Sequence, residues 1–389
     1  MLDFRLAGPD DRELVENLWA YCFEPKEHPF FRWYFTNMYK PENVLLGFRE
    51  DNLACLAHLN PYKINVRRTV LPVSYVVGLA THPAARRGGL GGQLLSASLQ
   101  EMKRRGQGIH ILMPSKAGFY QQYGYELYCH QWRETLPLEE LRLLTDRSVQ
   151  YGFVNSTDQW YYLATVYEKY TARLSGYAVR DEASWRRHID AQLAEGNIAV
   201  VFDGAEPIAY AFYQLGEPTI RCSEFVYSAY KGKKGLLGYF YNHRSQGEVL
   251  QWNEGLRDQS YRFYPDGKKG HETMPFMTGR IVDVKTALEA IPYDKTVQEK
   301  VIFAVNDPIA DWNTGVFALS VKDGIGHVER TIDAAAAGTI PVGSLALLVL
   351  GAADAGELQF YDKLTVTGKG LDTLQCIFPK TDCYINEWY

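Results

Sequence analysis

The residues best suited to chemistry in this chain form a basic, glycine-rich segment at positions 86–92. Its members are Arg86, Arg87, Gly88, Gly89, Leu90, Gly91 and Gly92. Glycines let a backbone approach an anion without a clash from Cβ, and the two arginines add positive charge. The segment therefore predicts a site for the phosphate of a nucleotide or a coenzyme.

The elements on either side of this turn fit the same chemistry. The apolar run 75–80 predicts a buried strand that stops before Pro83, and residues 93–102 carry apolar side chains at helical spacing. A strand, a glycine-rich turn and a helix present backbone N–H groups and the positive end of the helix dipole to an anion. All three elements favour the phosphate site.

The composition indicates a globular protein of two or three domains. At 389 residues, the chain is long enough for more than one hydrophobic core. Hydrophobic residues make up 46% and charged residues 22%, which is the balance of a folded protein. The formal net charge of −5 argues against a general nucleic-acid binder, which is usually strongly basic.

Neither a membrane segment nor a metal centre is expected. The N-terminus lacks the layout of a signal peptide, and the longest apolar run, 342–353, is shorter than the roughly 18 residues that span a bilayer. Six scattered cysteines without a C-x-x-C pair favour reduced thiols in the cytoplasm. Nine histidines are dispersed, and His82 and His110 are expected to be structural.

Residues 1–150 predict a first α/β unit. A helix is expected at 10–19, followed by a β-hairpin over 43–60. The strand, turn and helix of the phosphate site come next. A further strand at 109–114 then leads into a segment of small and aromatic residues, 115–125.

Residues 151–278 predict a second unit that coarsely repeats the first. Its expected elements are helices at 160–174 and 183–193, strands at 197–202, 207–213 and 223–230, and a helix at 235–243. A basic turn at 231–235 precedes the last helix but lacks the full glycine and arginine pattern. This coarse repeat fits either a second phosphate site or a degenerate structural copy of the first unit, and we favour the degenerate copy.

Residues 279–389 predict a third unit, after a solvated connector at 268–271. It opens with a strand at 280–284. The other expected elements are helices at 285–291 and 331–338 and strands at 301–307, 316–321 and 325–328. The aromatic chain end, 385–389, is expected to be packed. The fold class is therefore α/β (α+β), with mixed sheets.

Two motifs in the first unit resemble the GNAT acetyltransferases. Residues 86–91 fit the Arg/Gln-x-x-Gly-x-Gly/Ala signature of that family, with the strand and the helix in place. Residues 115–125, which end in Tyr-Gln-Gln-Tyr-Gly-Tyr, resemble the later family segment in which an aromatic residue precedes a Tyr-x-x-x-Gly-Tyr ending. The two motifs stand in the family order.

The order of the three units resembles the Eis family of N-acetyltransferases. That resemblance implies a catalytic GNAT domain at 1–150, a degenerate GNAT-like domain at 151–278 and a sterol-carrier-protein-like domain at 279–389. It covers essentially the whole chain, although the specific motifs lie in its first third. It also implies a cytoplasmic homo-oligomer, a hexamer, with acetyl-CoA as the cosubstrate and no metal.

The resemblance also implies roles for individual residues. The contacts to acetyl-CoA would come from Leu79, Ala80, Thr81, Arg86, Arg87, Gly88, Gly89, Leu90, Gly91 and Ser115. Tyr120 matches the general acid, which protonates the departing thiolate, and the terminal carboxylate of Tyr389 would be the general base. A phenol with an unperturbed pKa of about 10 is protonated at neutral pH and can supply that proton.

Several assignments stay open at this point. Lys103, Arg104 and Arg105 fit either a grip on the 3′-phosphate of the coenzyme or the C-terminus of a helix, where cations are favoured, and we favour the helix. An acidic residue is expected directly before the chain end, but Trp388 stands there and Glu387 precedes it.

The acceptor also stays open. A cationic small molecule, aminoglycoside-like or polyamine-like, is the acceptor we favour, and transfer to a peptide lysine is the variant within the same enzyme class. A binding protein for coenzyme A and an apolar ligand is the non-enzymatic alternative. No nucleic-acid or membrane partner is expected.

Overall fold

The computed structural model describes residues 2–85, 89–264, 270–332 and 334–388. The chain divides into two compact units. The first unit combines Met1–Tyr128, Phe276–Thr381 and Glu387–Tyr389, and the second combines Cys129–Pro275 and Asp382–Asn386. No helix in the described ranges is both long enough and apolar enough to cross a bilayer.

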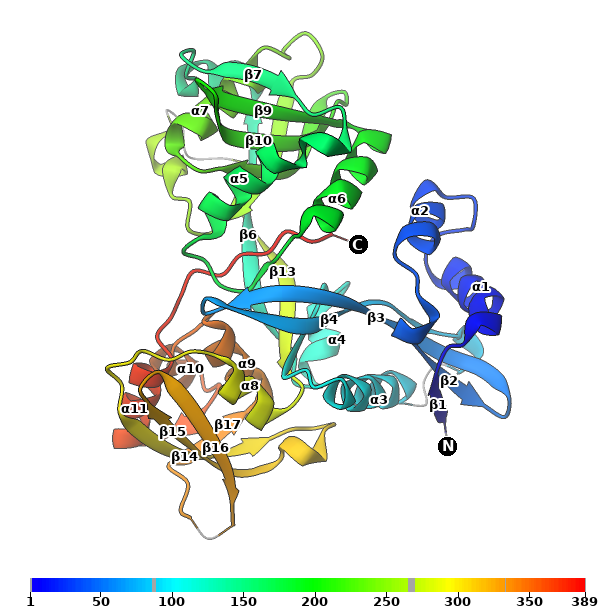
Figure 1. The fold of residues 1–389 in the computed structure, drawn as a ribbon, viewed down its shortest axis with the longest axis vertical. Helices are drawn as coiled ribbons and strands as arrows, with labels where there is room; N and C mark the ends of the chain where they lie inside the picture. Colours follow the sequence, from blue (N-terminus) through cyan, green and yellow to red (C-terminus); the bar gives the residue numbers. More distant parts are fainter. Residues whose placement is uncertain (1, 86–88, 265–269, 333, 389) are drawn as a thin grey trace. The chain divides into compact units, whose positions relative to one another are not determined.

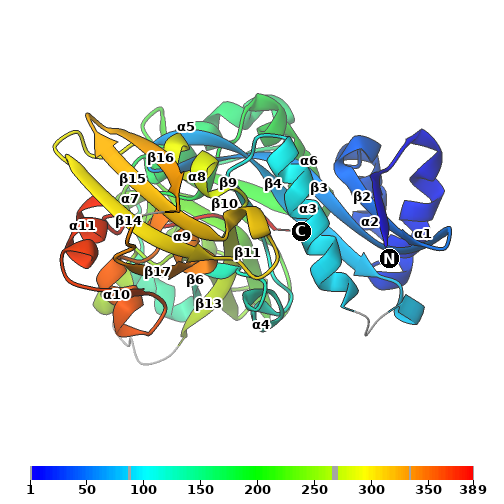
Figure 2. The ribbon, with the colours of Figure 1, turned by 90° about the horizontal axis from the view of Figure 1, so that it is seen from below.

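The first unit begins with a mixed sheet whose strands follow the order β1, β2, β3, β4, β5 and β13. Their bounds are Asp3–Leu6, Val44–Arg49, Asn52–Val66, Thr69–Thr81, Ile109–Leu112 and His271–Ile281. The helices of this part are α1 (Arg12–Cys22), α2 (Pro29–Asn37), α3 (Leu90–Arg104) and α4 (Ala117–Gln121). In Figures 1 and 2, α3 runs beside β3 and β4, which it contacts.

Most of the elements predicted for this part are confirmed. The hairpin over 43–60 is the antiparallel pair of β2 and β3, and its turn residues Glu50 and Asp51 have positive φ. The predicted helices at 10–19 and 93–102 lie within η1 (Pro9–Asp11), α1 and α3. The prediction did not include α2 or the long hairpin of β3 with β4.

The prediction that Arg280 and Ile281 open the third unit is wrong. Both residues end β13, where Arg280 is the partner of His110 and Ile281 of Ile109 in β5. The guanidinium of Arg280 is wholly buried and paired with Asp307 at 2.6 Å. That pair is the reason why a charged residue can end a buried strand, since an unpaired buried charge is strongly unfavourable.

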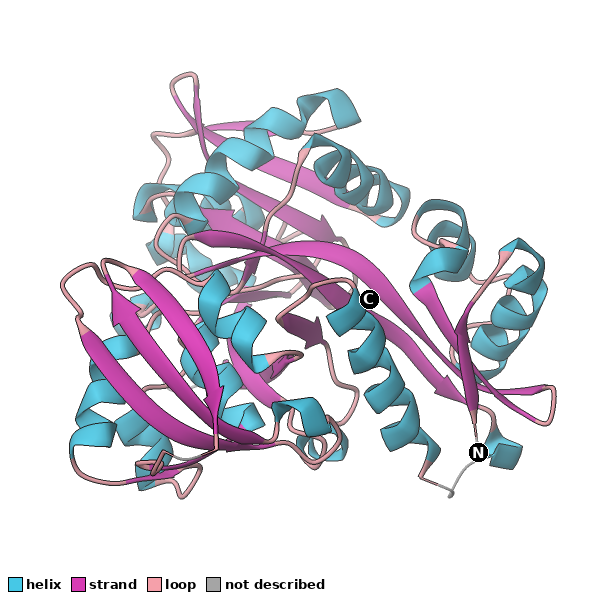
Figure 3. Ribbon diagram, turned by 60° about the horizontal axis from the view of Figure 1, so that its bottom comes forward, coloured by secondary structure: helices cyan, strands magenta, loops and turns pink. Residues whose placement is uncertain are grey.

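The remaining part of the first unit is a five-stranded sheet in the order β16, β15, β14, β17 and β18, shown in Figure 3. Their bounds are Ile325–Thr331, Gly315–Lys322, Glu299–Asn306, Gly338–Pro341 and Thr365–Val366. Its helices are α8 (Val284–Ala290), α9 (Val342–Leu350), α10 (Ala355–Phe360) and α11 (Lys369–Ile377). The helix predicted at 331–338 is wrong, because β16 ends at Thr331 and β17 begins at Gly338.

Residues 307–314, which connect β14 and β15, form a loop that packs into the core of the first sheet. Ala310, Ile309 and Trp312 join a hydrophobic cluster that contains side chains from α3, β5 and α4. The Ser96 hydroxyl on α3 donates to the Ile309 carbonyl at 2.8 Å. The first sheet and the second sheet of this unit therefore share one core at the 307–314 loop.

The second unit contains strands in the order β6, β12, β11, β10, β9 and β7. Their bounds are Glu126–Pro137, Val249–Gly255, Thr219–Tyr227, Glu206–Gln214, Asn197–Asp203 and Gln150–Phe153. Its main helices are α5 (Trp160–Thr171), α6 (Glu182–Glu195) and α7 (Tyr230–Tyr241). The helices predicted at 160–174 and 183–193 and the hairpin of β9 with β10 are confirmed.

The basic turn predicted at 231–235 is wrong, because these residues lie in the first turns of α7. A Cβ on Gly232 would lie 2.5 Å from the Ile208 carbonyl oxygen, and one on Gly235 would lie 2.6 Å from Val201 Cγ1. The glycines thus allow α7 to lie close against the sheet. Lys268 and Lys269 of the predicted connector are outside the described residues, and His271 begins β13.

We expect Asp307→Ala to lower the free energy of unfolding by about 3–5 kcal/mol, because it leaves the Arg280 charge buried and unpaired. Denaturant unfolding of the full chain measures this change. Asp311→Ala is the matched control, since Asp311 lies on the same loop but is exposed, and such surface changes stay within about 0.5 kcal/mol. Equal effects of both substitutions would contradict the prediction.

Candidate functional site

The strands β4 and β5 are paired over a short distance only. Within the described residues their parallel ladder joins Tyr75 to Ile111 and Val76 to Leu112. The strand β5 ends at Leu112, whereas β4 continues to Thr81. Beyond Val76, the β5 side of β4 is therefore available for an extended ligand that adds to the strand through backbone hydrogen bonds.

A β-bulge interrupts β4 at this point. Leu56 of β3 pairs with Ala80, but His58 pairs with Val77, so that Gly78 and Leu79 stand opposite a single residue of β3. Gly78 has a φ of 57°, which is a conformation that favours glycine. The bulge bends β4 locally and changes the direction of the backbone groups of Leu79 and the residues that follow it.

Trp19 of α1 lies directly against this bulge. A Cβ on Gly78 would lie 2.2 Å from Trp19 Cζ3, so only glycine fits at this position. The indole ring stacks on Tyr34 with ring centroids 4.6 Å apart, and its Nε1 donates to Glu24 at 3.1 Å. Sequence reasoning missed Trp19, because nothing in the sequence indicates its contact with a glycine far along the chain.

The described part of the glycine-rich turn begins at Gly89. Arg86, Arg87 and Gly88 lie outside the described residues, so their roles stay predictions. Gly89 has a φ of 68° and is the N-cap of α3, which begins at Leu90. The first N–H groups of α3 are therefore placed as a helix N-terminus that can receive an anion.

Gly91 and Gly92 have a further structural role. A Cβ on Gly91 would lie 3.0 Å from Phe119 Cζ, and one on Gly92 would lie 2.9 Å from Tyr123 Cε1. The two glycines thus bring the start of α3 close to the segment that carries Tyr120. The start of α3 is therefore packed against Phe119 and Tyr123, on either side of Tyr120 in the chain.

Tyr120 is on α4, a helix of five residues that follows β5. Its side chain is 8% exposed and belongs to the same hydrophobic cluster as Val76, Leu112 and Tyr125. Burial raises the pKa of the phenol, since the charged phenolate is disfavoured in an apolar environment. Tyr120 is therefore protonated at neutral pH.

Ser115 and the basic end of α3 are placed as follows. Ser115 is exposed just before α4, and its predicted coenzyme contact stays a prediction. Lys103 pairs with Asp283 at 2.7 Å, and Arg104 and Arg105 both pair with Glu101 at 2.7 Å. These ion pairs favour the structural interpretation of the three cations over a grip on the 3′-phosphate.

The end of the chain lies against β3 and β4. The Tyr75 hydroxyl donates to the Glu387 carbonyl at 3.0 Å, and the Tyr62 hydroxyl donates to Glu387 Oε2 at 3.4 Å. The ring of Trp388 lies 4.7 Å from that of Phe276 in β13. The predicted packing of the chain end is thus observed for Glu387, whereas Trp388 is 44% exposed and Tyr389 lies outside the described residues.

The histidines show no arrangement suited to a metal. Within the described ranges, no group of three His, Cys, Asp or Glu residues is placed to hold a metal ion. Burial lowers the pKa of both His58 and His110 to about 3, so both imidazoles are neutral. His58 Nδ1 is hydrogen-bonded to the Tyr34 hydroxyl at 2.9 Å.

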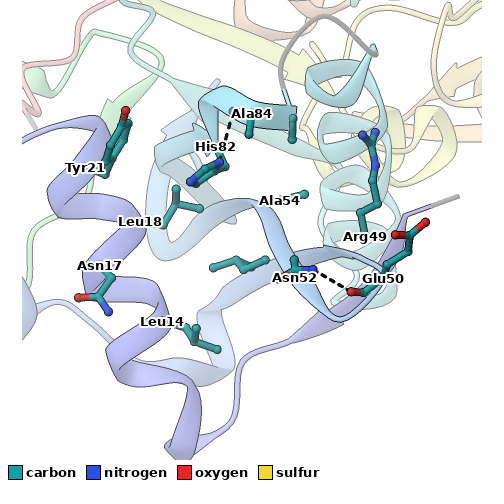
Figure 4. Close-up of a pocket in the computed structure, with 12 residues that line it drawn as sticks. Leu14, Asn17, Leu18, Tyr21, Arg49, Glu50, Asn52, Ala54, His82 and Ala84 are labelled. Atoms are coloured by element: carbon teal, nitrogen blue, oxygen red, sulfur yellow. Dashed lines mark hydrogen bonds between the residues drawn. The ribbon is translucent and has the colours of Figure 1, made fainter.

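A cavity of about 660 Å³ lies between α1, the turn of the β2–β3 hairpin and the end of β4 (Figure 4). Leu14, Leu18 and Tyr21 line one wall, and His82 and Ala84 line another. Its lining includes neither Tyr120, Ser115 nor Glu387. The predicted acid therefore does not line this cavity.

In the second unit, β11, α7 and β12 follow one another as β4, α3 and β5 do in the first unit, but their interior contains a buried ion pair. The strands β11 and β12 are parallel from Thr219 to Cys222, and α7 follows β11. Lys233 on α7 is wholly buried, and its ammonium donates to Glu254 at 2.7 Å and to Ser260 Oγ at 2.7 Å. This internal ion pair supports the degenerate structural copy over a second phosphate site.

Comparison with known proteins defines the class. Residues 3–128 and residues 176–281 each match an acetyltransferase (GNAT) domain, and residues 284–386 match a sterol carrier protein domain. No curated protein matches the chain. The matches identify the chain as a GNAT acetyltransferase.

Solved structures share the fold over the full length of both chains. A GCN5-related N-acetyltransferase from Anabaena variabilis has 20% identity and a TM-score of 0.87, with 100% of each chain covered. A probable N-acyltransferase from Enterococcus faecalis has 19% identity and a TM-score of 0.86, again with 100% of each chain covered. Eis1 from Mycobacterium abscessus has 18% identity and a TM-score of 0.75, with the same coverage. The predicted order of two GNAT domains followed by a sterol-carrier-protein-like domain is confirmed.

We expect Gly78→Ala to weaken the binding of coenzyme A. The new methyl group must displace Trp19 or flatten the bulge, which would turn the backbone groups of β4 away from the ligand. Losing one or two hydrogen bonds raises the Kd by about tenfold, and titration calorimetry with coenzyme A measures this. Gly8→Ala is the control, because a Cβ there lies at an ordinary 3.7 Å from Asp11. An unchanged Kd for Gly78→Ala would exclude a role of the bulge in binding.

Proposed function

We propose that this protein is an acetyl-CoA-dependent N-acetyltransferase that transfers acetyl to the amines of a cationic small molecule, aminoglycoside-like or polyamine-like. Transfer is direct, within a complex of enzyme, acetyl-CoA and amine. The observation that carries the proposal is the protonated, buried Tyr120, which shares a hydrophobic cluster with Leu90 and Leu94 of α3 in a domain that matches the GNAT model.

The coenzyme arm adds to β4 beyond the β4–β5 ladder. Backbone groups of Leu79, Ala80 and Thr81 hold the pantetheine, and the turn from Arg86 to Gly91 holds the pyrophosphate. The Leu79 N–H stabilises the oxyanion that develops on the thioester carbonyl. The bulge at Gly78 supports this role, because it redirects the backbone of β4 just beyond Val76, the last residue of the β4–β5 ladder.

Tyr120 donates its proton to the departing sulfur. Since burial raises its pKa, the phenol is protonated and able to donate at neutral pH. Ser115, five positions earlier in the chain, contacts the coenzyme near its thiol. No covalent enzyme intermediate is needed, and both substrates held in one site gain the advantage of proximity.

The terminal carboxylate of Tyr389 acts as the general base toward the amine. Support comes from the two residues before it, because Glu387 is hydrogen-bonded to Tyr62 and Tyr75 and Trp388 packs on Phe276. Tyr75 is itself the first residue of the β4–β5 ladder. The Glu387 side chain is itself almost wholly buried, at 2% exposed. The family resemblance supports a homohexamer, which sedimentation measurements can test.

The proposed activity is tested by thiol release from acetyl-CoA with a panel of aminoglycosides, polyamines and lysine peptides. Turnover with the cationic small molecules supports the proposal, and turnover with peptides alone favours the lysine acetyltransferase. Binding of coenzyme A without turnover on any amine would contradict both.

We expect Tyr120→Phe to reduce kcat by about 10²–10⁴-fold, the usual contribution of a general acid. The Kd for coenzyme A should be nearly unchanged, because the ring and its packing are kept. Steady-state kinetics and titration calorimetry measure the two quantities. Tyr21→Phe is the control, since Tyr21 is 67% exposed and distant in the chain. Equal kcat values for both variants would show that the acid is another group.

We expect extension of the chain by two glycines after Tyr389, or deletion of Tyr389, to reduce turnover strongly. Both changes displace the carboxylate, whereas the coenzyme contacts on β4 and α3 are untouched. Rates and coenzyme affinity are measured for both variants, and two glycines added before Met1 serve as the control. Survival of full activity in both variants would show that the base lies elsewhere or that the amine arrives neutral.

A further inference from the structure

The Arg280 side chain joins three segments that are far apart in the sequence. Its Nε donates to the Tyr123 carbonyl at 2.9 Å, and its Nη1 donates to the Ile281 carbonyl at 2.5 Å. Its Nη2 donates to Asp307 Oδ1 at 2.6 Å. The guanidinium is wholly buried. Its hydrogen bonds to Ile281 and Asp307 are buried and costly to lose, and the one to Tyr123 is part-buried.

The turn that Arg280 holds directly follows the helix of the proposed acid. The Tyr123 N–H donates to the Tyr120 carbonyl at 2.9 Å. The Tyr125 ring lies between the two, 5.6 Å from the Tyr120 ring and 5.7 Å from the Arg280 Cζ atom. Gly124 has a φ of 83°, and a Cβ there would lie 2.5 Å from Val342 Cγ1 of α9. The turn is therefore fixed from two sides.

The Asp307 side chain is held in place by hydrogen bonds within its own loop as well as by Arg280. Its Oδ1 accepts from the backbone N–H groups of Ile309 at 3.1 Å and Ala310 at 3.0 Å. Its Oδ2 accepts from Asn313 Nδ2 at 3.0 Å. The carboxylate thus organises the 307–314 loop of the sterol carrier protein domain and presents a rigid acceptor to the guanidinium.

The helix α4 has only five residues, too few to hold a side chain precisely by its own hydrogen bonds. We infer that the sterol carrier protein domain, through Asp307 and Arg280, positions Tyr120 for proton transfer. Arg280 is a positioning residue, and this role rests on the proposed function of Tyr120 as the acid. The third domain thereby takes part in catalysis without touching a substrate.

The test is Arg280→Lys in the full chain, alone and combined with Tyr120→Phe. A lysine keeps the charge opposite Asp307, but it lacks the planar fork that bonds Asp307 and the Tyr123 carbonyl together. We expect kcat with acetyl-CoA and the best amine of the panel to fall about tenfold, as for a misplaced catalytic group, with KM nearly unchanged. In the Tyr120→Phe background the same substitution should have no further effect.

Hydrogen exchange supplies a readout that needs no turnover. Arg280→Lys should speed amide exchange in residues 115–125. Ser96→Ala is the matched control, because it removes a different hydrogen bond to the same loop, that to Ile309, and should leave exchange in 115–125 unchanged. Unchanged exchange in Arg280→Lys would overturn the inference. An equal loss of kcat in the Tyr120 and Tyr120→Phe backgrounds would overturn it as well.

The outcomes separate this inference from the proposed function. If Tyr120→Phe keeps full kcat, the acid is misassigned and the proposed function fails on that point. If Tyr120→Phe loses activity but Arg280→Lys changes neither kcat nor exchange, the positioning role alone is wrong.

Discussion

The first unit depends on the buried ion pair between Arg280 and Asp307. The two charges are wholly removed from water, and each is stabilised by the other and by the hydrogen bonds around them. The pair connects the last strand of the catalytic sheet to the 307–314 loop, and the guanidinium continues to the turn after α4. A buried pair of this kind costs much to break, because the remaining partner keeps its charge without solvation.

The proposed coenzyme site depends on a second feature, which is the point where β5 ends while β4 continues. A glycine bulge with Trp19 packed on it bends β4 there. The glycines at the start of α3 bring the helix close to Phe119 and Tyr123, which flank the proposed acid in the chain. The second unit has the same order of strands and helix, but Lys233, Glu254 and Ser260 fill its interior with an ion pair.

Local patterns in the sequence predicted much of the fold. The hairpin over 43–60 follows from its turn residues, and the helix α3 follows from its apolar spacing. Arg280 could not be placed, because only the distant Asp307 makes its burial possible. The alanines at 334–337 favour a helix, yet this segment connects two strands of the last sheet. Likewise, the glycines of α7 suggested a turn, although they serve close packing of a helix on a sheet.

The candidate site was predicted in part. Tyr120 and β4 are adjacent to recognisable motifs, whereas Trp19, Tyr62 and Tyr75 contribute through contacts between segments that no pattern in the sequence connects. The ion pair of Lys103 could not be predicted for the same reason, since its partner Asp283 lies far along the chain. Spacing identifies groups that can react, and tertiary packing decides which of them are held in place.

The most direct test of the account is a crystal structure of the protein with acetyl-CoA or coenzyme A. We predict one coenzyme per chain, extended along Leu79 to Thr81, with its sulfur within hydrogen-bond distance of the Tyr120 hydroxyl. A coenzyme bound in the second unit, or a sulfur remote from Tyr120, would contradict it.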